Sequence, residues 1–350
     1  MYDSDTSTVT TALHNSNATV FSDQTISNIL ALTTHTNDTT VRFDMAAPDA
    51  NGNVTVASGA EVVLVTTSNT FTTTVKPPVN APVVIFQGRG GVIATINDGG
   101  SSVPSGNQTH VDRVVVGSAG DDKIIVADAK NTSVILGSGN STVVTGHGVD
   151  TVQAGLGNST ITGGSGDYAV VKLAGNASNY QVAVQNGHAV VTDMTTHKTT
   201  DISKIQYVQL DNGNALVFAK DSVEGAISTL YHSAFGRDAD AGGLNYWFDL
   251  GRAGASLKQI ASGFVNSTEF VTAHQGQDDT AFIQSLYQNT FGRAGEGAGV
   301  SFWLDALAHG STRADLLTNF SQIAVQNIMH TAPNQEAQVI GSVTIVQGII

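Results

Sequence analysis

A glycine repeat with a period of nine residues constrains the fold of this chain more than any other feature of its sequence. Large aliphatic residues recur with the same period. One short strand and one tight turn per repeat satisfy both series, because glycine tolerates the positive φ of a turn and an aliphatic side chain fills the core between sheets. The middle of the chain is therefore predicted to form a parallel β-solenoid. The glycines are Gly139, Gly148, Gly157 and Gly166, and the aliphatic residues are Val143, Val152, Ile161 and Val170.

The segments around the repeat predict a multidomain chain in which β structure is followed by helices. Residues 1–80 are rich in Thr, Ser and Asn with short β-like runs, which predicts an N-terminal all-β module. Residues 81–220 are expected to form the solenoid together with strands that close its open end. At about residue 221 the apolar period changes from two to 3.6, which predicts a helical domain over residues 221–335. Residues 336–350 are expected to form a C-terminal tail.

The helical segment is an internal duplication with an offset of 56 residues, as from Gly236 to Gly292. Both copies follow the pattern G-R-x-x-D/E-x-x-G-x-x-aromatic-W. A binding interpretation places the Arg, Asp and Trp in a sugar or partner site, because Trp stacks on sugars and Arg pairs with carboxylates. We favour a structural interpretation, in which Arg237 fixes a loop through Asp240, the second glycine permits a sharp turn and the tryptophan fills the core. The motif residues are Arg237, Asp240, Gly243 and Trp247 in the first copy and Arg293, Glu296, Gly299 and Trp303 in the second.

The charge of the chain favours cations over nucleic acids as ligands. The formal net charge is −14 at pH 7, whereas phosphate recognition depends on clustered Lys and Arg. The sequence contains no cysteine, which excludes disulfides and thiolate metal sites. It also has no run of eighteen apolar residues, so no membrane-spanning helix is predicted.

Two stretches carry a family resemblance. The segments 117–124 (GSAGDDKI) and 146–152 (GHGVDTV) resemble the RTX nonapeptide, G-G-x-G-x-D-x-U-x with U a large aliphatic residue. The resemblance implies a parallel β-roll, calcium in its turns, and secretion by a type I apparatus. Such proteins have no N-terminal signal peptide, and none is recognisable here; residues 336–350 are a candidate secretion signal. The helical duplication resembles a tandem domain of unassigned function that accompanies such repeats in secreted bacterial proteins, including surface-layer and adhesive proteins.

The repeat supplies the candidate calcium ligands, because calcium takes six to eight oxygen ligands. In the roll that the resemblance implies, each ion lies between turns about eighteen residues apart, yet no two aspartates of the repeat have that spacing. Asn140 and Asn158 do have it, so one side of the stack is predicted to be held by hydrogen bonds without a metal. The candidate residues for a metal are Asp121, Asp122, Asp150, Asp167, Asn140 and Asn158.

The sequence carries no H-E-x-x-H, G-x-S-x-G or phosphate-loop motif. We therefore expect a structural protein and not an enzyme: an extracellular, calcium-assisted protein that self-assembles into a surface layer on a Gram-negative bacterium. A secreted adhesin or biofilm-matrix filament is the alternative. A polysaccharide-acting enzyme is a third interpretation, since such enzymes use widely separated carboxylates. The expected partners are other copies of the chain and lipopolysaccharide or another surface polysaccharide.

Overall fold

The computed structural model describes residues 2–16, 20–33, 40–98, 110–164, 168–185, 188–211, 213, 215–331, 337–340 and 343–347. Its contacts divide the chain into two compact units, which are described separately. The strand unit comprises Met1–Gln181 and His188–Asp211, and the helical unit comprises Val182–Gly187 and Asn212–Ile350.

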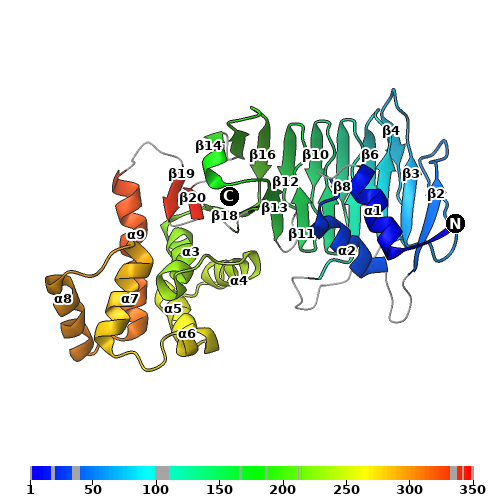
Figure 1. Ribbon diagram of the computed structural model, residues 1–350. Coiled ribbons are helices and arrows are strands. Elements are labelled where there is room, and N and C mark those ends of the chain that lie inside the picture. Colours follow the sequence, from blue (N-terminus) through cyan, green and yellow to red (C-terminus); the bar gives the residue numbers. More distant parts are fainter. Residues whose placement is uncertain are drawn as a thin grey trace. The chain divides into compact units, whose positions relative to one another are not determined.

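The strand unit consists mainly of parallel strands in two sheets (Figure 1). Consecutive strands from β3 to β13 alternate between the sheets, so neighbours within one sheet come from every second strand of the chain. The first sheet contains, in spatial order, β1 (Tyr2–Asp5), β2 (Thr40–Ala46), β3 (Val62–Thr66), β5 (Val83–Gln87), β7 (Arg113–Val116), β9 (Thr132–Ile135), β11 (Asp150–Gln153), β13 (Ala169–Leu173) and β17 (Tyr207–Leu210). The second contains β15 (His188–Asp193), β16 (Thr199–Ser203), β12 (Ser159–Thr162), β10 (Ser141–Val144), β8 (Asp122–Val126), β6 (Val92–Ile96) and β4 (Thr73–Val75).

The nine-residue period appears in the structure as one short strand per repeat. Strands β10 to β13 follow one another at this spacing, and the four aliphatic residues of the repeat are buried. Residues eighteen apart lie side by side, because Ser141 pairs with Ser159 in neighbouring parallel strands. The coarse prediction of parallel β structure followed by helices is therefore correct.

Apolar residues cover both faces of the first sheet near its N-terminal end. Strands β5 and β7 are buried along almost their whole length, which is typical of parallel strands that are covered on both sides. One face packs toward the second sheet. The other carries Val83, Val114 and Ile135 and packs against two helices, α1 (Thr6–Ser16) and α2 (Asp23–Thr33), through a shared apolar cluster (Figure 1).

These two helices differ from the prediction of an all-β module for residues 1–80. The Thr-rich and Ser-rich composition suggested strands, but Val9 and Leu13 lie four residues apart and share one helical face. In α2, Ile26 and Ile29 lie three residues apart and also share one helical face. Burial of these faces against the sheet outweighs the weak helix propensity of threonine and serine.

The join predicted near residue 80 is also absent from the structure. Strands β3 and β5 lie on either side of it and pair in parallel, with Val62 opposite Val83. Residues 1–80 therefore belong to the same unit as the repeat, and the division between the units falls near Asp211 and not at residue 220.

The helical unit shows the duplication as pairs of equivalent helices. Helices α3 and α4 correspond to α7 and α8 at the offset of 56 residues, and α9 covers the stretch equivalent to α5 and α6. Both α3 and α7 end at a left-handed glycine, Gly236 and Gly292, with φ of 66°. The helices are α3 (Ser222–Phe235), α4 (Ala241–Arg252), α5 (Leu257–Val265), α6 (Thr268–Ala273), α7 (Asp279–Phe291), α8 (Gly297–Ala308) and α9 (Arg313–Thr331).

Three strands complete the helical unit. Strand β18 (Ala215–Ala219) pairs in parallel with β20 (Val343–Gln347), which pairs antiparallel with β19 (Ala337–Ile340). The predicted C-terminal tail thus contains two strands within its described residues. Of the helices described, none combines the length and the apolar character needed to cross a membrane.

Candidate functional site

The glycines of the repeat serve close packing and not a turn with positive φ. A Cβ at Gly139 would overlap the backbone of Gly120, and one at Gly157 would overlap Gly139. Neither residue is among those with positive φ. The prediction that these glycines are needed for a left-handed turn is therefore wrong; they allow the backbones of successive turns to stack in contact. Gly166 lies outside the described residues.

Two candidate metal ligands, Asp122 and Asp150, are buried and accept hydrogen bonds from backbone N–H groups. Each carboxylate accepts one from the residue four positions earlier, at 2.7 Å from Ser118 and 2.6 Å from Gly146. Each accepts another from the first residue of the neighbouring strand, at 2.9 Å from Val92 for Asp122 and at 2.8 Å from Thr132 for Asp150. The two aspartates thus tie a turn to the preceding strand of the same sheet.

Burial dominates the electrostatics of both carboxylates. Desolvation raises the pKa of Asp122, and it raises the pKa of Asp150 to about 7, against the opposing effect of the N–H donors. Near Asp150 lies a buried ion pair, in which Arg113 donates to Asp128 at 2.8 and 3.0 Å and to the hydroxyl of Thr132 at 2.8 Å. A buried pair of this kind leaves a costly unpaired charge if either partner is removed.

Asp121, Asn140 and Asn158 form a ladder of side-chain hydrogen bonds along one row of turns. The side-chain oxygen of each accepts the backbone N–H of the next residue in the row: Asp121 from Asn140 at 2.8 Å, and Asn140 from Asn158 at 2.9 Å. Asn158 in turn accepts from the N–H of Thr199 at 3.0 Å. The hydrogen-bonded side predicted from the eighteen-residue spacing of Asn140 and Asn158 is thus present.

The candidate metal residues do not converge on one point. Over the described ranges, no group of three or more His, Cys, Asp or Glu side chains is placed to hold a metal ion. Asp167 lies outside those ranges. Calcium binding through carbonyl oxygens or a rearranged turn stays a prediction that the structure leaves open to experiment.

In the helical unit, Arg237 pairs with a different acid from the one predicted. Its guanidinium donates two hydrogen bonds to Glu269, at 2.8 and 2.9 Å, and lies over the ring of Tyr231 at 5.1 Å. Asp240 instead begins helix α4, where its side chain accepts from the N–H of Gly243 at 2.8 Å. Arg237 thus pairs with Glu269 and not with the predicted Asp240. Glu269 lies 32 residues away in the sequence, so no local spacing could identify it as the partner.

The second copy keeps the stacking of the arginine on a tyrosine but not the ion pair or the helix cap of the first copy. Arg293 lies 3.6 Å from Glu296 in an exposed ion pair and stacks over Tyr287 at 5.5 Å. Glu296 begins α8 without a side-chain capping bond. Such an exposed pair contributes little to stability, so the charged residues of the motif make different contacts in the two copies.

Gly243 and Gly299 allow a tyrosine to approach the helix closely, which differs from the sharp turn predicted. Both lie in the first turn of a helix, and a Cβ on either would overlap a tyrosine hydroxyl: that of Tyr231 at Gly243 and that of Tyr287 at Gly299. The sharp turns come at the preceding glycines that end α3 and α7. The second glycine of the motif therefore marks a close contact between two helices, α3 with α4 in the first copy and α7 with α8 in the second.

The motif tryptophans link the interior of the unit to an exposed aromatic ring. Trp247 packs on Phe264 with ring centroids 4.8 Å apart, and Trp303 packs on Phe320 at 5.3 Å. On its other side each tryptophan meets the preceding aromatic edge-on at 4.9 Å. These aromatics, Tyr246 and Phe302, are 55% and 64% exposed and occupy equivalent positions in the two copies.

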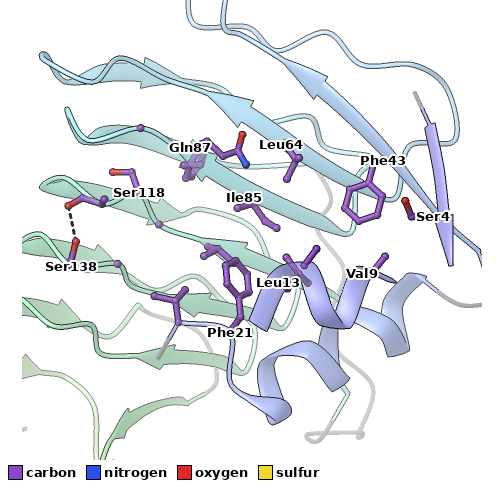
Figure 2. A pocket seen from close by; sticks show the side chains of 18 of the residues that line it. Ser4, Val9, Leu13, Phe21, Phe43, Leu64, Ile85, Gln87, Ser118 and Ser138 are labelled. Carbon is purple, nitrogen blue, oxygen red and sulfur yellow. Dashed lines mark hydrogen bonds between the residues drawn. The ribbon is translucent and has the colours of Figure 1, made fainter. Parts of the chain in front are cut away.

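A pocket of about 470 Å³ lies in the strand unit between α1, the segment that precedes α2, and the first sheet. Figure 2 shows Leu13 and Phe21 on one side of the space, with Leu64 and Ile85 on strands of the sheet. None of its described lining residues is charged, so its lining suits a neutral, mainly apolar molecule. The polar groups on its wall are Ser4, Thr8, Gln87, Ser118 and Ser138.

A second pocket, of about 540 Å³, contains a lysine that the sequence analysis did not single out. Lys172 lies in β13, within the run Ala169-Val170-Val171-Lys172-Leu173. A lone lysine in an otherwise apolar strand was the available signal. This signal is weak, because a strand residue that faces away from the core is usually exposed and polar.

Comparison with curated proteins gave no match, and comparison with solved structures gave none either. Residues 218–274 and 261–324 match a family described as "Domain of unknown function (DUF4214)". Both stretches lie in the helical unit and together cover less than half of the chain. The similarity is thus confined to the duplicated helical segment.

Proposed function

We propose that this chain is a non-catalytic structural protein that self-assembles into a surface layer on a Gram-negative bacterium. In this proposal it is exported by a type I apparatus, and the strand unit is a calcium-assisted β-roll. Its partners are other copies of the chain and a surface polysaccharide such as lipopolysaccharide.

The observation that carries the proposal is the pair of exposed aromatic rings in the helical unit. Tyr246 and Phe302 are held rigidly, because each rests on a tryptophan that is itself packed on a buried phenylalanine. A preordered aromatic ring loses little conformational entropy on binding, which favours a protein contact.

Because the helical segment is duplicated, each subunit carries two such aromatic rings. Figure 1 shows α4 and α8, which carry the two rings, on opposite sides of the helices α3, α7 and α9. A subunit with two outward contacts forms an open-ended chain when the contacts do not close a ring. A two-dimensional layer needs at least one further contact elsewhere on the molecule.

Electron microscopy of the purified full-length chain, with and without calcium, tests this proposal. We expect ordered sheets from the wild type. Tyr246→Ala or Phe302→Ala should abolish the sheets, and the double variant should form much smaller particles than the wild type by light scattering.

Val271→Ala is the matched control, since Val271 lies on α6 of the same unit and is 59% exposed. It should assemble like the wild type. Persistent wild-type monomers at high concentration would overturn self-assembly, and sheets from the double variant would show that the aromatic rings do not carry it.

An adhesin is the second candidate function. The polar pocket around Lys172 favours it, because that pocket combines a cation with amide and carboxylate groups that suit a sugar.

A further inference from the structure

Three residues of the first sheet form a polar row across neighbouring strands. Gln153 of β11 lies opposite Lys172 of β13, which lies opposite Gln209 of β17. All three line the pocket of about 540 Å³. Neighbouring strands are about 4.8 Å apart, so the row sets an ammonium group between two amides at a spacing comparable to that of the substituents on a sugar ring.

The same row is apolar farther toward the N-terminal end of the sheet. Val116 and Ile135 precede Gln153 in it, and both belong to the apolar cluster under α1 and α2. The row therefore becomes polar where the pocket begins. This change places the amides and the ammonium at a concave surface and not on a flat, open sheet.

Lys172 has no acidic partner among the described residues. The pKa of its ammonium is lowered by desolvation alone, with no contribution from a neighbouring carboxylate. A partly buried cation without a counterion is unfavourable in the free protein. An anionic group that entered the pocket would remove this penalty.

The other charged residues of the pocket restrict the class of ligand further. Asp193, Asp211 and Lys198 also line the pocket, which makes its formal charge balanced. The side chain of Asp193 accepts N–H bonds from the turn that follows it, and Asp211 accepts one from Gly175 at 2.9 Å. These carboxylates still offer lone pairs to hydroxyl donors, but they disfavour a second negative charge on the group that contacts Lys172.

We propose that this pocket binds an acidic sugar residue of a polysaccharide, with the sugar carboxylate on Lys172 and its hydroxyls on Gln153 and Gln209. A uronic acid has one negative charge and several hydroxyls, which matches the partly buried ammonium of Lys172 among amides and acids. A phosphorylated sugar, with up to two charges on one group, fits the same surroundings less well. This inference supports the adhesin function and does not rest on self-assembly, because one copy of the chain contains the whole site.

Isothermal titration calorimetry with trigalacturonic acid on the full-length protein tests the inference. Wild-type protein should bind it, and should bind the neutral trisaccharide maltotriose at least tenfold more weakly. Lys172→Met should weaken trigalacturonate binding at least tenfold, because a charge-assisted hydrogen bond is lost.

Two controls keep the outcome clear. Lys172→Met removes an unpaired, partly buried charge and retains a long apolar stem, so it should unfold at the same or higher urea concentration than the wild type. Lys123→Met removes an exposed lysine of β8 outside this pocket and should bind normally. The inference is overturned if the wild type does not bind, if both trisaccharides bind equally, if glucose 1-phosphate binds more tightly, or if Lys172→Met binds like the wild type.

Discussion

Asp150 makes the stability of the strand unit depend on pH. Its carboxyl is buried, and desolvation raises its pKa from 3.8 to about 7 in the folded chain. The folded state therefore holds the proton more tightly than the unfolded state between these values. The stability contributed by the protonated form is complete below about pH 4 and is lost as pH rises through 7. One pKa unit corresponds to about 1.4 kcal/mol, so the effect is of the order of a few kcal/mol.

Asp150→Asn should flatten this pH dependence, because the amide does not titrate. We expect the free energy of unfolding of the wild type to fall between pH 5 and pH 8 by about 1–3 kcal/mol more than that of the variant. Urea denaturation at the two pH values measures it. Asp121→Asn serves as the control, since Asp121 is exposed and lies in the outer ladder. Equal slopes for Asp150→Asn and the wild type would show that Asp150 is not the titrating group.

At the scale of single elements, the glycine in the first turn of α4 fixes how α3 approaches it. Gly243→Ala should destabilise the helical unit by about 1–3 kcal/mol, although alanine favours an isolated helix, because the new Cβ overlaps the hydroxyl of Tyr231. Removing that hydroxyl with Tyr231→Phe should relieve much of the cost. A double-mutant cycle followed by thermal denaturation measures the coupling.

Gly297→Ala is the matched substitution in the second copy. It lies in the first turn of α8, and its new Cβ meets nothing within 4 Å. This variant should be as stable as the wild type or more stable by up to about 1 kcal/mol. If both alanine variants have the same effect, close packing does not explain Gly243.

The strands and helices were predictable from the sequence where its residues repeat with a regular spacing. The nine-residue series located the strands around Val143 and Val152, and the spacing of 56 residues located the paired helices. The helices α1 and α2 were missed because a short apolar face, such as that of Val9 and Leu13, is stabilised by the sheet it covers and not by its own sequence.

The site was less predictable than the fold because its contacts join distant parts of the chain. The spacing of Asn140 and Asn158 was sufficient to predict their ladder, since both lie in the regular repeat. By contrast, the partner of Arg237 lies 32 residues away, and the flanking residues of Lys172 come from separate strands. The register between strands brings such residues together, and the sequence alone does not give that register.

For the whole molecule, calcium dependence remains the main prediction from the repeat. If calcium binds the turns, adding about 5 mM calcium, which exceeds the dissociation constants of ~0.1–1 mM found for weak extracellular sites, should raise the midpoint of thermal unfolding, and EGTA should reverse the change. Magnesium at the same concentration is the control, because it prefers a stricter octahedral geometry. An unfolding midpoint and assembly state that are unchanged by EGTA would contradict a role for calcium.

The parallel register of the strand unit also determines how it can carry mechanical load. Main-chain hydrogen bonds between neighbouring strands, and the ladder through Asp121, Asn140 and Asn158, are directed from one turn of the stack to the next. A pull along this direction loads the turns in series, so the end turn peels away first. A pull along the strands shears many bonds at once. The force needed to unfold this unit therefore depends on the direction in which it is pulled.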